Sequence, residues 1–131
     1  MSIKRVHHIA IICSDYPASR RFYVDVLGFR VLREVYRAER RSHKGDLVLP
    51  GGIQIELFSF PDAPSRPSHP EARGLRHLAL AVDDIETEVA RLVGLGVSVE
   101  PIRVDPATGC RYTFFPDPDG LPLELYEIRG E

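Results

Sequence analysis

Two histidines and two glutamates occupy matching positions in the two halves of this 131-residue chain. His8 begins the stretch HIAIICSD and His77 begins the similar stretch HLALAVDD, while Glu56 lies in IQIELF and Glu124 in LPLELY. Each glutamate follows its histidine at almost the same interval. Imidazole nitrogen and carboxylate oxygen together suit Zn²⁺, Ni²⁺, Co²⁺, Mn²⁺ or Fe²⁺. The four residues are therefore candidate ligands of one divalent metal ion.

Strand alternation places these side chains on the face away from the larger apolar residues. Small residues accompany the histidines, which leaves space in front of that face. The histidine and glutamate faces are made by His8, Ala10 and Ile12; by Gln54, Glu56 and Phe58; by His77, Ala79 and Ala81; and by Pro122, Glu124 and Tyr126. If the two sheets curl toward each other, the four side chains converge. A divalent ion then removes the cost of burying unpaired carboxylates, which is several kcal/mol.

The elements that carry these residues follow the order βαβββ twice. The first half predicts a strand at 3–13, a helix capped at Ser14 or Asp15 and ending at Gly28, and strands at 30–39, 45–52 and 53–60, with a basic connector at 39–45. The second predicts a strand at 76–82, a helix at 83–96 with Ile85, Val89 and Leu92 on its apolar face, and strands at 97–105, 110–117 and 122–128. Residues 61–73 contain four prolines and are predicted to be an extended linker. The repeat predicts an α+β fold of two tandem modules, about 1–62 and about 74–131, within one domain 1–131.

Composition narrows the classes of partner. The chain has 17 basic and 19 acidic residues and a net charge of −2, so nothing draws it toward nucleic acid or an anionic membrane. No apolar run approaches the roughly 20 residues of a bilayer span, and no apolar signal segment opens the sequence. The two cysteines, Cys13 and Cys110, are expected to be plain packing or surface residues rather than a disulfide. We therefore expect a cytoplasmic protein with a small-molecule substrate.

The stretches VHHIAI, FYVDVLGF, IELF, LRHLAL and DPDGLPLELYE resemble the vicinal oxygen chelate superfamily, also called the glyoxalase/bleomycin resistance/dioxygenase group. The resemblance covers nearly the whole chain. Within the superfamily, EVYRAERRSHKGDL and RVDPATGCRYTFFPDPDGLPLELYE are similar to the small YaeR-like, glyoxalase-related proteins. The resemblance to the superfamily implies paired βαβββ modules that form an open β-cup around a metal. It also implies a homodimer in which sheets and metal ligands can be shared between subunits.

The glyoxalase I pattern of two histidines and two glutamates falls on His8, Glu56, His77 and Glu124. The resemblance then implies a lyase or isomerase reaction on a small, anionic, oxygenated substrate, through a metal-stabilised enediolate. Either Glu56 or Glu124 serves as the catalytic base. Ile12 and Phe60 stand where bacterial glyoxalase I has an arginine and an asparagine that help to hold glutathione, so a glutathione substrate is not implied.

Basic and aromatic residues near the glutamate strands are candidates for holding the substrate. Arginine and lysine bind carboxylate and phosphate groups, and aromatic rings wall a pocket. The candidates are Arg37, Arg41, Lys44, Arg103 and Arg111 for an anionic group, and Phe58, Phe60, Tyr112 and Phe114 for the walls. Two further histidines, His43 and His69, are expected in solvent-exposed loops.

Three other functions are open at this point. An Fe²⁺-dependent ring-cleaving dioxygenase of similar fold uses two histidines and one glutamate, which would leave Glu56 spare. A metal-dependent thiol transferase of the fosfomycin resistance type uses a similar metal site. A drug-binding resistance protein needs no metal ligands, so keeping all four argues against it.

Overall fold

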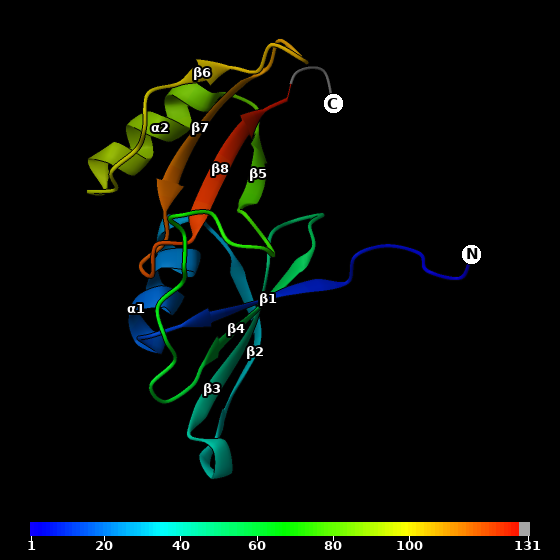
Figure 1. The fold of residues 1–131 in the computed structure, drawn as a ribbon, viewed down its shortest axis with the longest axis vertical. Coiled ribbons are helices and arrows are strands. Elements are labelled where there is room, and N and C mark those ends of the chain that lie inside the picture. Colours follow the sequence, from blue (N-terminus) through cyan, green and yellow to red (C-terminus); the bar gives the residue numbers. More distant parts are fainter. Residues whose placement is uncertain (129–131) are drawn as a thin grey trace. The chain divides into compact units, whose positions relative to one another are not determined.

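The structure, a computed structural model, describes residues 1–128, and the chain divides into two compact units between Ser65 and Arg66. The first unit contains β1 (His8–Cys13), α1 (Tyr16–Arg21), a π-helical segment (Phe22–Val26), β2 (Arg30–Arg37), a 3₁₀ turn (Ala38–Arg40), β3 (Ser42–Val48) and β4 (Gln54–Ser59). The second contains β5 (Leu78–Val82), α2 (Ile85–Gly94), β6 (Arg103–Val104), β7 (Arg111–Pro116) and β8 (Pro122–Glu127) (Figure 1).

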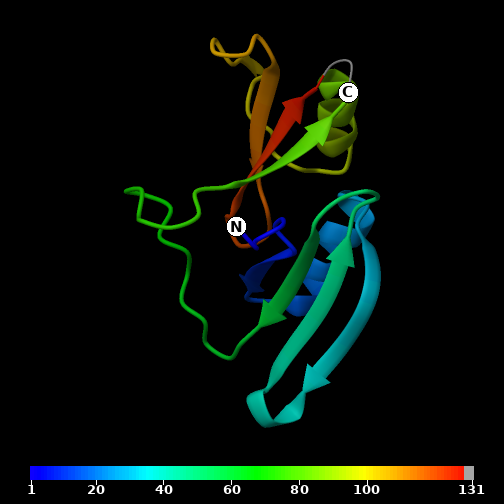
Figure 2. The ribbon, with the colours of Figure 1, turned by 90° about the vertical axis from the view of Figure 1, so that its right-hand side faces the viewer.

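Each unit is built on one four-stranded mixed sheet. The strand orders are β1-β4-β3-β2 and β5-β8-β7-β6, so the two sheets have the same topology. In each sheet the first strand pairs in parallel with the last, and the other pairs are antiparallel. The long β2–β3 hairpin and its turn are clearest in Figure 2. The predicted α+β fold with a repeated module is confirmed.

Both helices begin at an aspartate that directly follows the first strand of its unit. Asp15 accepts a hydrogen bond from the Ala18 amide at 3.1 Å, and Asp84 accepts one from the Thr87 amide at 3.2 Å. These contacts satisfy amide groups that the first turn of a helix leaves without partners. Gly28 has a φ of +85° just beyond the first helical region, a conformation that favours glycine. The predicted cap at Asp15 and the end at Gly28 are confirmed.

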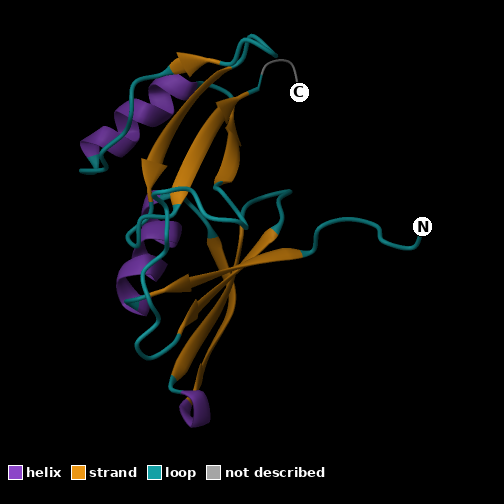
Figure 3. Cartoon of the chain, in the orientation of Figure 1, coloured by secondary structure: helices purple, strands orange, loops and turns teal. Residues whose placement is uncertain are grey.

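Each unit has a helix beside its sheet (Figure 3), and the buried apolar side chains come from both. In the second unit, Ile85 and Leu92 of α2 are fully buried, and Leu123 and Leu125 of β8 are buried with them. In the first unit the buried residues include Ile11, Cys13, Tyr23, Leu47, Ile55 and Leu57. The opposite face of each sheet carries the histidines and glutamates, as the alternation predicts.

Three predicted elements differ from the structure. The first strand starts at His8 rather than residue 3, because its register pairs His8 with Gln54, where β4 begins. The predicted strand at 97–105 is reduced to Arg103–Val104, since proline at 101 cannot donate to a sheet. The connector at 39–45 is shorter than predicted, because β3 already begins at Ser42 after a tight turn in which Arg41 has a φ of +47°.

No helix within residues 1–128 combines the length and the apolar character needed to cross a membrane.

Candidate functional site

In the first unit, His8 and Glu56 are in contact on the open face of the sheet. His8 Nε2 lies 3.3 Å from Glu56 Oε2, and the Glu56 side chain is 17% exposed. The parallel register places Ala10, not a larger residue, directly beside Glu56. The other nitrogen of the His8 ring, Nδ1, lies 3.0 Å from Nδ1 of His7, so Nε2 is the nitrogen turned to the carboxylate.

In the second unit, His77 and Glu124 repeat this contact. His77 Nε2 lies 3.3 Å from Glu124 Oε1, and the side chains are 28% and 13% exposed. Ala79 pairs with Glu124 as Ala10 pairs with Glu56. Two copies of the module therefore build the same histidine–glutamate pair at equivalent places, with His8 at the first position of β1 and His77 directly before β5.

The separation within each pair fits two ligands of one metal ion. Ligands bound at about 2.1 Å lie roughly 3.0 Å apart when they subtend a right angle, and about 3.4 Å apart in a tetrahedral arrangement. The observed 3.3 Å falls within this span in both pairs. Among residues 1–128, no group of three or more histidine, cysteine, aspartate and glutamate side chains is gathered closely enough to hold a metal. The structure thus brings the four predicted ligands together as two pairs, one in each unit.

The surroundings of the two glutamates differ, although the sequence repeat treats them as equivalent. Asp46 lies directly across from Glu56 in β3 and is 4% exposed, whereas Phe114 lies across from Glu124 in β7. The Phe114 ring meets the His77 ring edge-on, with 5.0 Å between centroids. The first pair therefore has charged neighbours and the second has an aromatic one.

One candidate cation of the first unit, Lys44, lies beside Glu56, and a second, Arg37, packs on the neighbouring Phe58 ring. Lys44 Nζ is 3.9 Å from Glu56 Oε1 and 3.3 Å from Asp46 Oδ1. Arg37 packs its guanidinium over the Phe58 ring, 5.3 Å from the centroid, and donates from Nη2 to Ser42 Oγ at 3.2 Å. Phe60, which directly follows β4, is stacked on Phe58 with 5.8 Å between centroids.

The candidate cations of the second unit are already paired. Arg103 donates to Glu100 at 3.0 Å and packs over Tyr112 and Phe114. Arg111 lies on the helix-facing side of the sheet, where it binds the buried Glu127, and these hydrogen bonds raise the pKa of Arg111. Because neighbouring positions of β7 alternate between faces, Arg111 points away from the face of Glu124. Arg111 therefore has a structural role.

The structure also places Arg41 and the two histidines that were expected in exposed loops. Arg41 is exposed in the turn between β2 and β3. His43, expected in an exposed loop, is half-buried in β3 and stacks on Tyr16 with 4.6 Å between ring centroids, so that expectation is wrong. The β2–β3 hairpin turns earlier than predicted, which brings His43 into the sheet. His69 is exposed, as expected.

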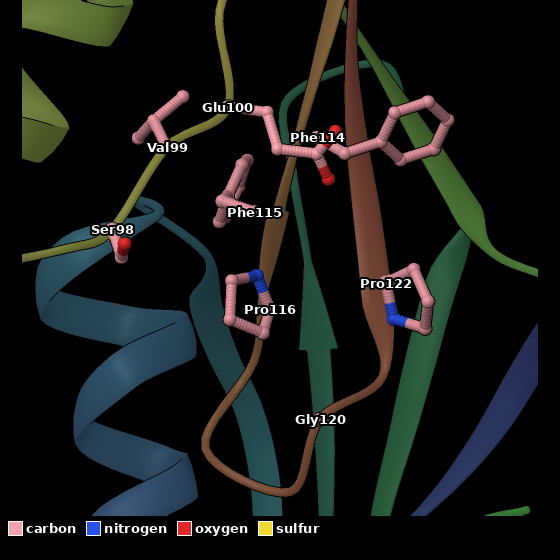
Figure 4. A pocket seen from close by; sticks show the side chains of 8 residues that line it. All are labelled: Ser98, Val99, Glu100, Phe114, Phe115, Pro116, Gly120 and Pro122. Atoms are coloured by element: carbon pink, nitrogen blue, oxygen red, sulfur yellow. The ribbon is translucent and has the colours of Figure 1, made fainter. Parts of the chain in front are cut away.

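A pocket of about 480 Å³ opens in the second unit beside the aromatic neighbour of His77. Figure 4 shows Phe114 and Pro122 on adjacent strands, with the segment 98–100 running alongside. Its lining residues are Ser98, Val99, Glu100, Phe114, Phe115, Pro116, Gly120 and Pro122. Phe114, one of the candidate wall residues, is among them.

Sequence reasoning missed Asp46 as a member of the open face of the first unit, and it missed the hydrogen-bond partners of Tyr126 on the open face of the second. Asp46 alternates with Lys44 in β3, so the pairing of β3 with β4 would have placed both beside Glu56. Tyr126 shares the Glu124 face, where its hydroxyl donates to Asp105 Oδ2 at 3.0 Å and contacts the Thr108 hydroxyl. Nothing in the sequence pairs Tyr126 with the 105–108 turn.

Comparison with known proteins agrees with these features. The chain is 62% identical to YaeR of Escherichia coli over 127 residues (97% of this chain, 98% of the relative) and 60% identical to YwkD of Bacillus subtilis over 127 residues (97% and 99%). It superposes on the crystal structure of a glyoxalase family protein from Enterococcus faecalis with a TM-score of 0.89 and 53% identity, covering 97% of this chain and 100% of that one.

A more distant relative has an enzyme name. The chain is 31% identical to the lactoylglutathione lyase of Haemophilus influenzae over 134 residues, which covers 96% of this chain and 94% of that enzyme. The family model described as glyoxalase/bleomycin resistance protein/dioxygenase superfamily matches residues 5–125. The repeated module, the fold and this match together show that the chain belongs to the glyoxalase/bleomycin resistance protein/dioxygenase superfamily.

Proposed function

We propose that this protein is a divalent-metal-dependent lyase or isomerase of the glyoxalase type that acts on a small, anionic, oxygenated substrate. The proposed metal ligands are His8, Glu56, His77 and Glu124. The observation that carries the proposal is the repeated contact, in which an imidazole Nε2 and a carboxylate oxygen lie 3.3 Å apart in each unit. We further propose that the protein works in the cytoplasm as a homodimer.

The donor set supports a divalent ion of the first transition row. Neutral imidazole nitrogen and carboxylate oxygen suit Zn²⁺, Ni²⁺, Co²⁺, Mn²⁺ and Fe²⁺, and geometry and availability decide among them. When bound, such an ion acts as a Lewis acid that stabilises negative charge on substrate oxygens. The relationship to a lactoylglutathione lyase supports this reaction class.

The chain's own residues supply binding and proton transfer. One glutamate, Glu56 or Glu124, accepts the proton that leaves the carbon next to a carbonyl group. A positioned carboxylate contributes about 10²–10⁴-fold to the rate of such a step. The alanines paired with the glutamates, Ala10 and Ala79, are both exposed, which leaves room for a substrate beside each carboxylate.

The substrate is not proposed to be a glutathione adduct. Ile12 occupies a position where bacterial glyoxalase I has an arginine for glutathione, and its side chain is 55% exposed and apolar. Phe60, at the other such position, stacks on Phe58. Neither residue can bind the charged and amide groups of a tripeptide in the same way, so we expect little turnover of methylglyoxal with glutathione.

Elemental analysis of the purified protein tests the proposal. We expect a transition metal bound in stoichiometric amount, lost in both His8→Ala and Glu124→Ala, and retained in His69→Ala, which removes an exposed histidine outside both pairs. Metal content that is unchanged in His8→Ala and Glu124→Ala would overturn the proposed site. Stoichiometric iron with substrate-dependent oxygen consumption would instead favour the ring-cleaving dioxygenase.

A further inference from the structure

We propose that Arg37 and Lys44, both packed on the Phe58 ring, form an oxyanion subsite that binds the carboxylate or phosphate group of the substrate beside Glu56. The identity of the bound molecule as a substrate rests on the proposed function. The subsite itself rests on contacts within the first unit, among strands β2, β3 and β4.

Arg37 is a cation without a carboxylate partner. Its Nε is buried and makes no hydrogen bond within residues 1–128, and no carboxylate of these residues lies within 4.0 Å of its guanidinium. Its Nη2 is held by Ser42 Oγ at 3.2 Å, and its carbon Cζ lies 5.3 Å from the Phe58 centroid. A buried donor without a partner is rare in folded proteins, so the guanidinium is held with part of its donor capacity unused. A guanidinium that is already fixed in this way can donate hydrogen bonds to an oxyanion with little further loss of side-chain freedom on binding.

Lys44 presents a second positive charge to the same ring. Its Nζ lies 5.9 Å from the Phe58 centroid, and its side chain is 29% exposed, so the ammonium group is reachable from solvent. It forms an ion pair with Asp46 Oδ1 at 3.3 Å, and Glu56 Oε1 lies 3.9 Å away. Lys44 therefore stands between the Phe58 ring and the glutamate proposed as a metal ligand.

The local charges leave a positive excess for an anion. The open face around Phe58 carries the cations Arg33, Arg37 and Lys44 and the carboxylates Asp46 and Glu56, and a further cation, Arg40, packs over the stacked Phe60 ring. Arg33 Nε binds Asp46 Oδ2 at 2.9 Å, and Glu56 is shared by His8 and Lys44. Arg37 has no carboxylate partner among these residues, so an oxyanion on it offsets part of the positive excess.

The spacing of the strand sets the size of the substrate. Phe58 and Glu56 lie on the same face of β4, two residues apart, which is a separation of roughly 7 Å. An anionic group over Phe58 and a carbonyl group beside Glu56 therefore belong to one short molecule. This favours a small oxo or hydroxy acid, or its phosphate ester, over a long conjugate.

The equivalent region of the second unit does not offer the same subsite. Arg103 also packs over two aromatic rings, but Glu100 binds its Nη2 at 3.0 Å. The position that pairs with Tyr126 as Lys44 pairs with Phe58 is Tyr112, which carries no charge. The two modules have diverged on this point, and the anion preference belongs to the first unit.

Binding of inorganic phosphate and of acetate to the full-length, metal-free protein tests the subsite. Backbone amide signals are followed by NMR at constant ionic strength, so that general screening does not change. We expect a saturable shift at Arg37, Lys44 and Phe58 with a millimolar dissociation constant. Tighter binding of phosphate points to a phosphate ester substrate, and tighter binding of acetate points to a carboxylate. Both outcomes support the subsite.

Matched variants separate this site from general positive charge. Arg37→Gln and Lys44→Gln are each expected to weaken binding at least tenfold, while Arg30→Gln removes the same charge from the far end of β2 and leaves binding unchanged. Arg37→Lys keeps the charge and the packing and is expected to retain part of the affinity. Equal weakening in Arg30→Gln and Arg37→Gln, or shifts that do not saturate, would overturn the subsite and leave an adventitious ion only.

The metal content of the same samples keeps the two proposals apart. Arg37→Gln is expected to lose anion binding and to keep the bound metal of the wild-type protein. A wild-type protein that binds metal but no anion refutes the subsite alone. A wild-type protein that binds the anion at Arg37 but no metal refutes the proposed function and retains the subsite as an anion-binding site.

Discussion

Arg111 donates two hydrogen bonds to Glu127, from Nε to Oε1 at 2.9 Å and from Nη2 to Oε2 at 2.8 Å. Glu127 is 2% exposed and also accepts a hydrogen bond from the Ile85 amide at 3.2 Å. One buried carboxylate therefore joins β7 and β8 to the first turn of α2. Glu124 and Glu127 point to opposite faces of β8, so the Glu127 contacts stabilise the strand on the face opposite to Glu124.

Glu127→Gln is expected to lower the free energy of unfolding by about 2 kcal/mol, since it removes the buried carboxylate to which Arg111 and the Ile85 amide donate hydrogen bonds. Urea denaturation at neutral pH measures this change. Glu86→Gln is the matched control, because Glu86 is exposed and contacts the same Arg111 at 3.4 Å; its effect should stay within about 0.5 kcal/mol. Equal midpoints for Glu127→Gln and the wild-type protein would contradict the structural role of the pair.

The repeat and the strand faces could be predicted from the sequence because both depend on local pattern. Alternation placed Ile11 and Cys13 in the core and His8 outside it, and short-range chemistry placed the cap at Asp15. Contacts between strands that are far apart in the sequence could not be predicted from local pattern. The pairing of Lys44 with Phe58, and of Asp46 with Glu56, depends on where the β2–β3 hairpin turns, and the sequence places that turn several residues too late. The same error put His43 in a loop.

Arg111 illustrates a second limit. Its charge and its nearness to a glutamate strand made it a candidate for substrate binding, but its partner, Glu127, stands 16 residues away on the neighbouring strand. The alternation within β7 already places Arg111 on the face of Thr113 and Phe115, which are buried. Applying the face argument to the cations, and not only to the metal ligands, would have excluded it.

Gly45→Ala is expected to destabilise the first unit by about 2 kcal/mol, because its Cβ would lie 2.2 Å from the Tyr16 hydroxyl oxygen. That hydroxyl cannot simply move, since it donates to Glu34 at 2.7 Å and the ring stacks on His43. In the double variant Tyr16→Phe with Gly45→Ala, the ring atom nearest to the new Cβ is Cζ at 3.2 Å. The loss of stability in the double variant should therefore be about 1 kcal/mol smaller than the sum of the losses in the two single variants.

Chemical denaturation of the two single variants and the double variant measures this coupling. Gly94→Ala, at the end of α2 with nothing within 4 Å of its Cβ, is the control and should change stability by less than about 1 kcal/mol. Strictly additive costs would show that the hydroxyl and the new methyl group do not meet.

The contribution of Glu34 to stability is expected to depend on pH. Hydrogen bonds from Arg20 and then from Tyr16 hold the pKa of Glu34 below its ordinary value of 4.5. A carboxylate with a lower pKa in the folded than in the unfolded state stabilises the fold above its unfolded pKa, and loses this contribution as the pH falls through its folded pKa. The stability difference between the wild-type protein and Glu34→Gln should therefore be constant from neutral pH down to about pH 5 and shrink below it. A difference that grows on acidification would reverse the sign and refute the assignment.

Divalent ions are expected to raise the melting temperature through the two histidine–glutamate pairs. A ligand that binds only the native state stabilises it by mass action, by about 2.7 kcal/mol at a concentration one hundred times its dissociation constant. For a chain of this length the gain corresponds to roughly 5–10 °C. The protein is treated with a chelator, and its melting temperature is then measured with added Zn²⁺, Ni²⁺, Co²⁺ or Mn²⁺.

His8→Gln and Glu124→Gln should each lose the gain, because each variant removes one of the two side chains that lie 3.3 Å apart and are proposed to bind the ion together. His69→Gln should keep it, which excludes binding to histidines in general. Equal gains in all three variants would place the ion elsewhere in the protein. Only a loss of the gain that is confined to the paired residues assigns the ion to them.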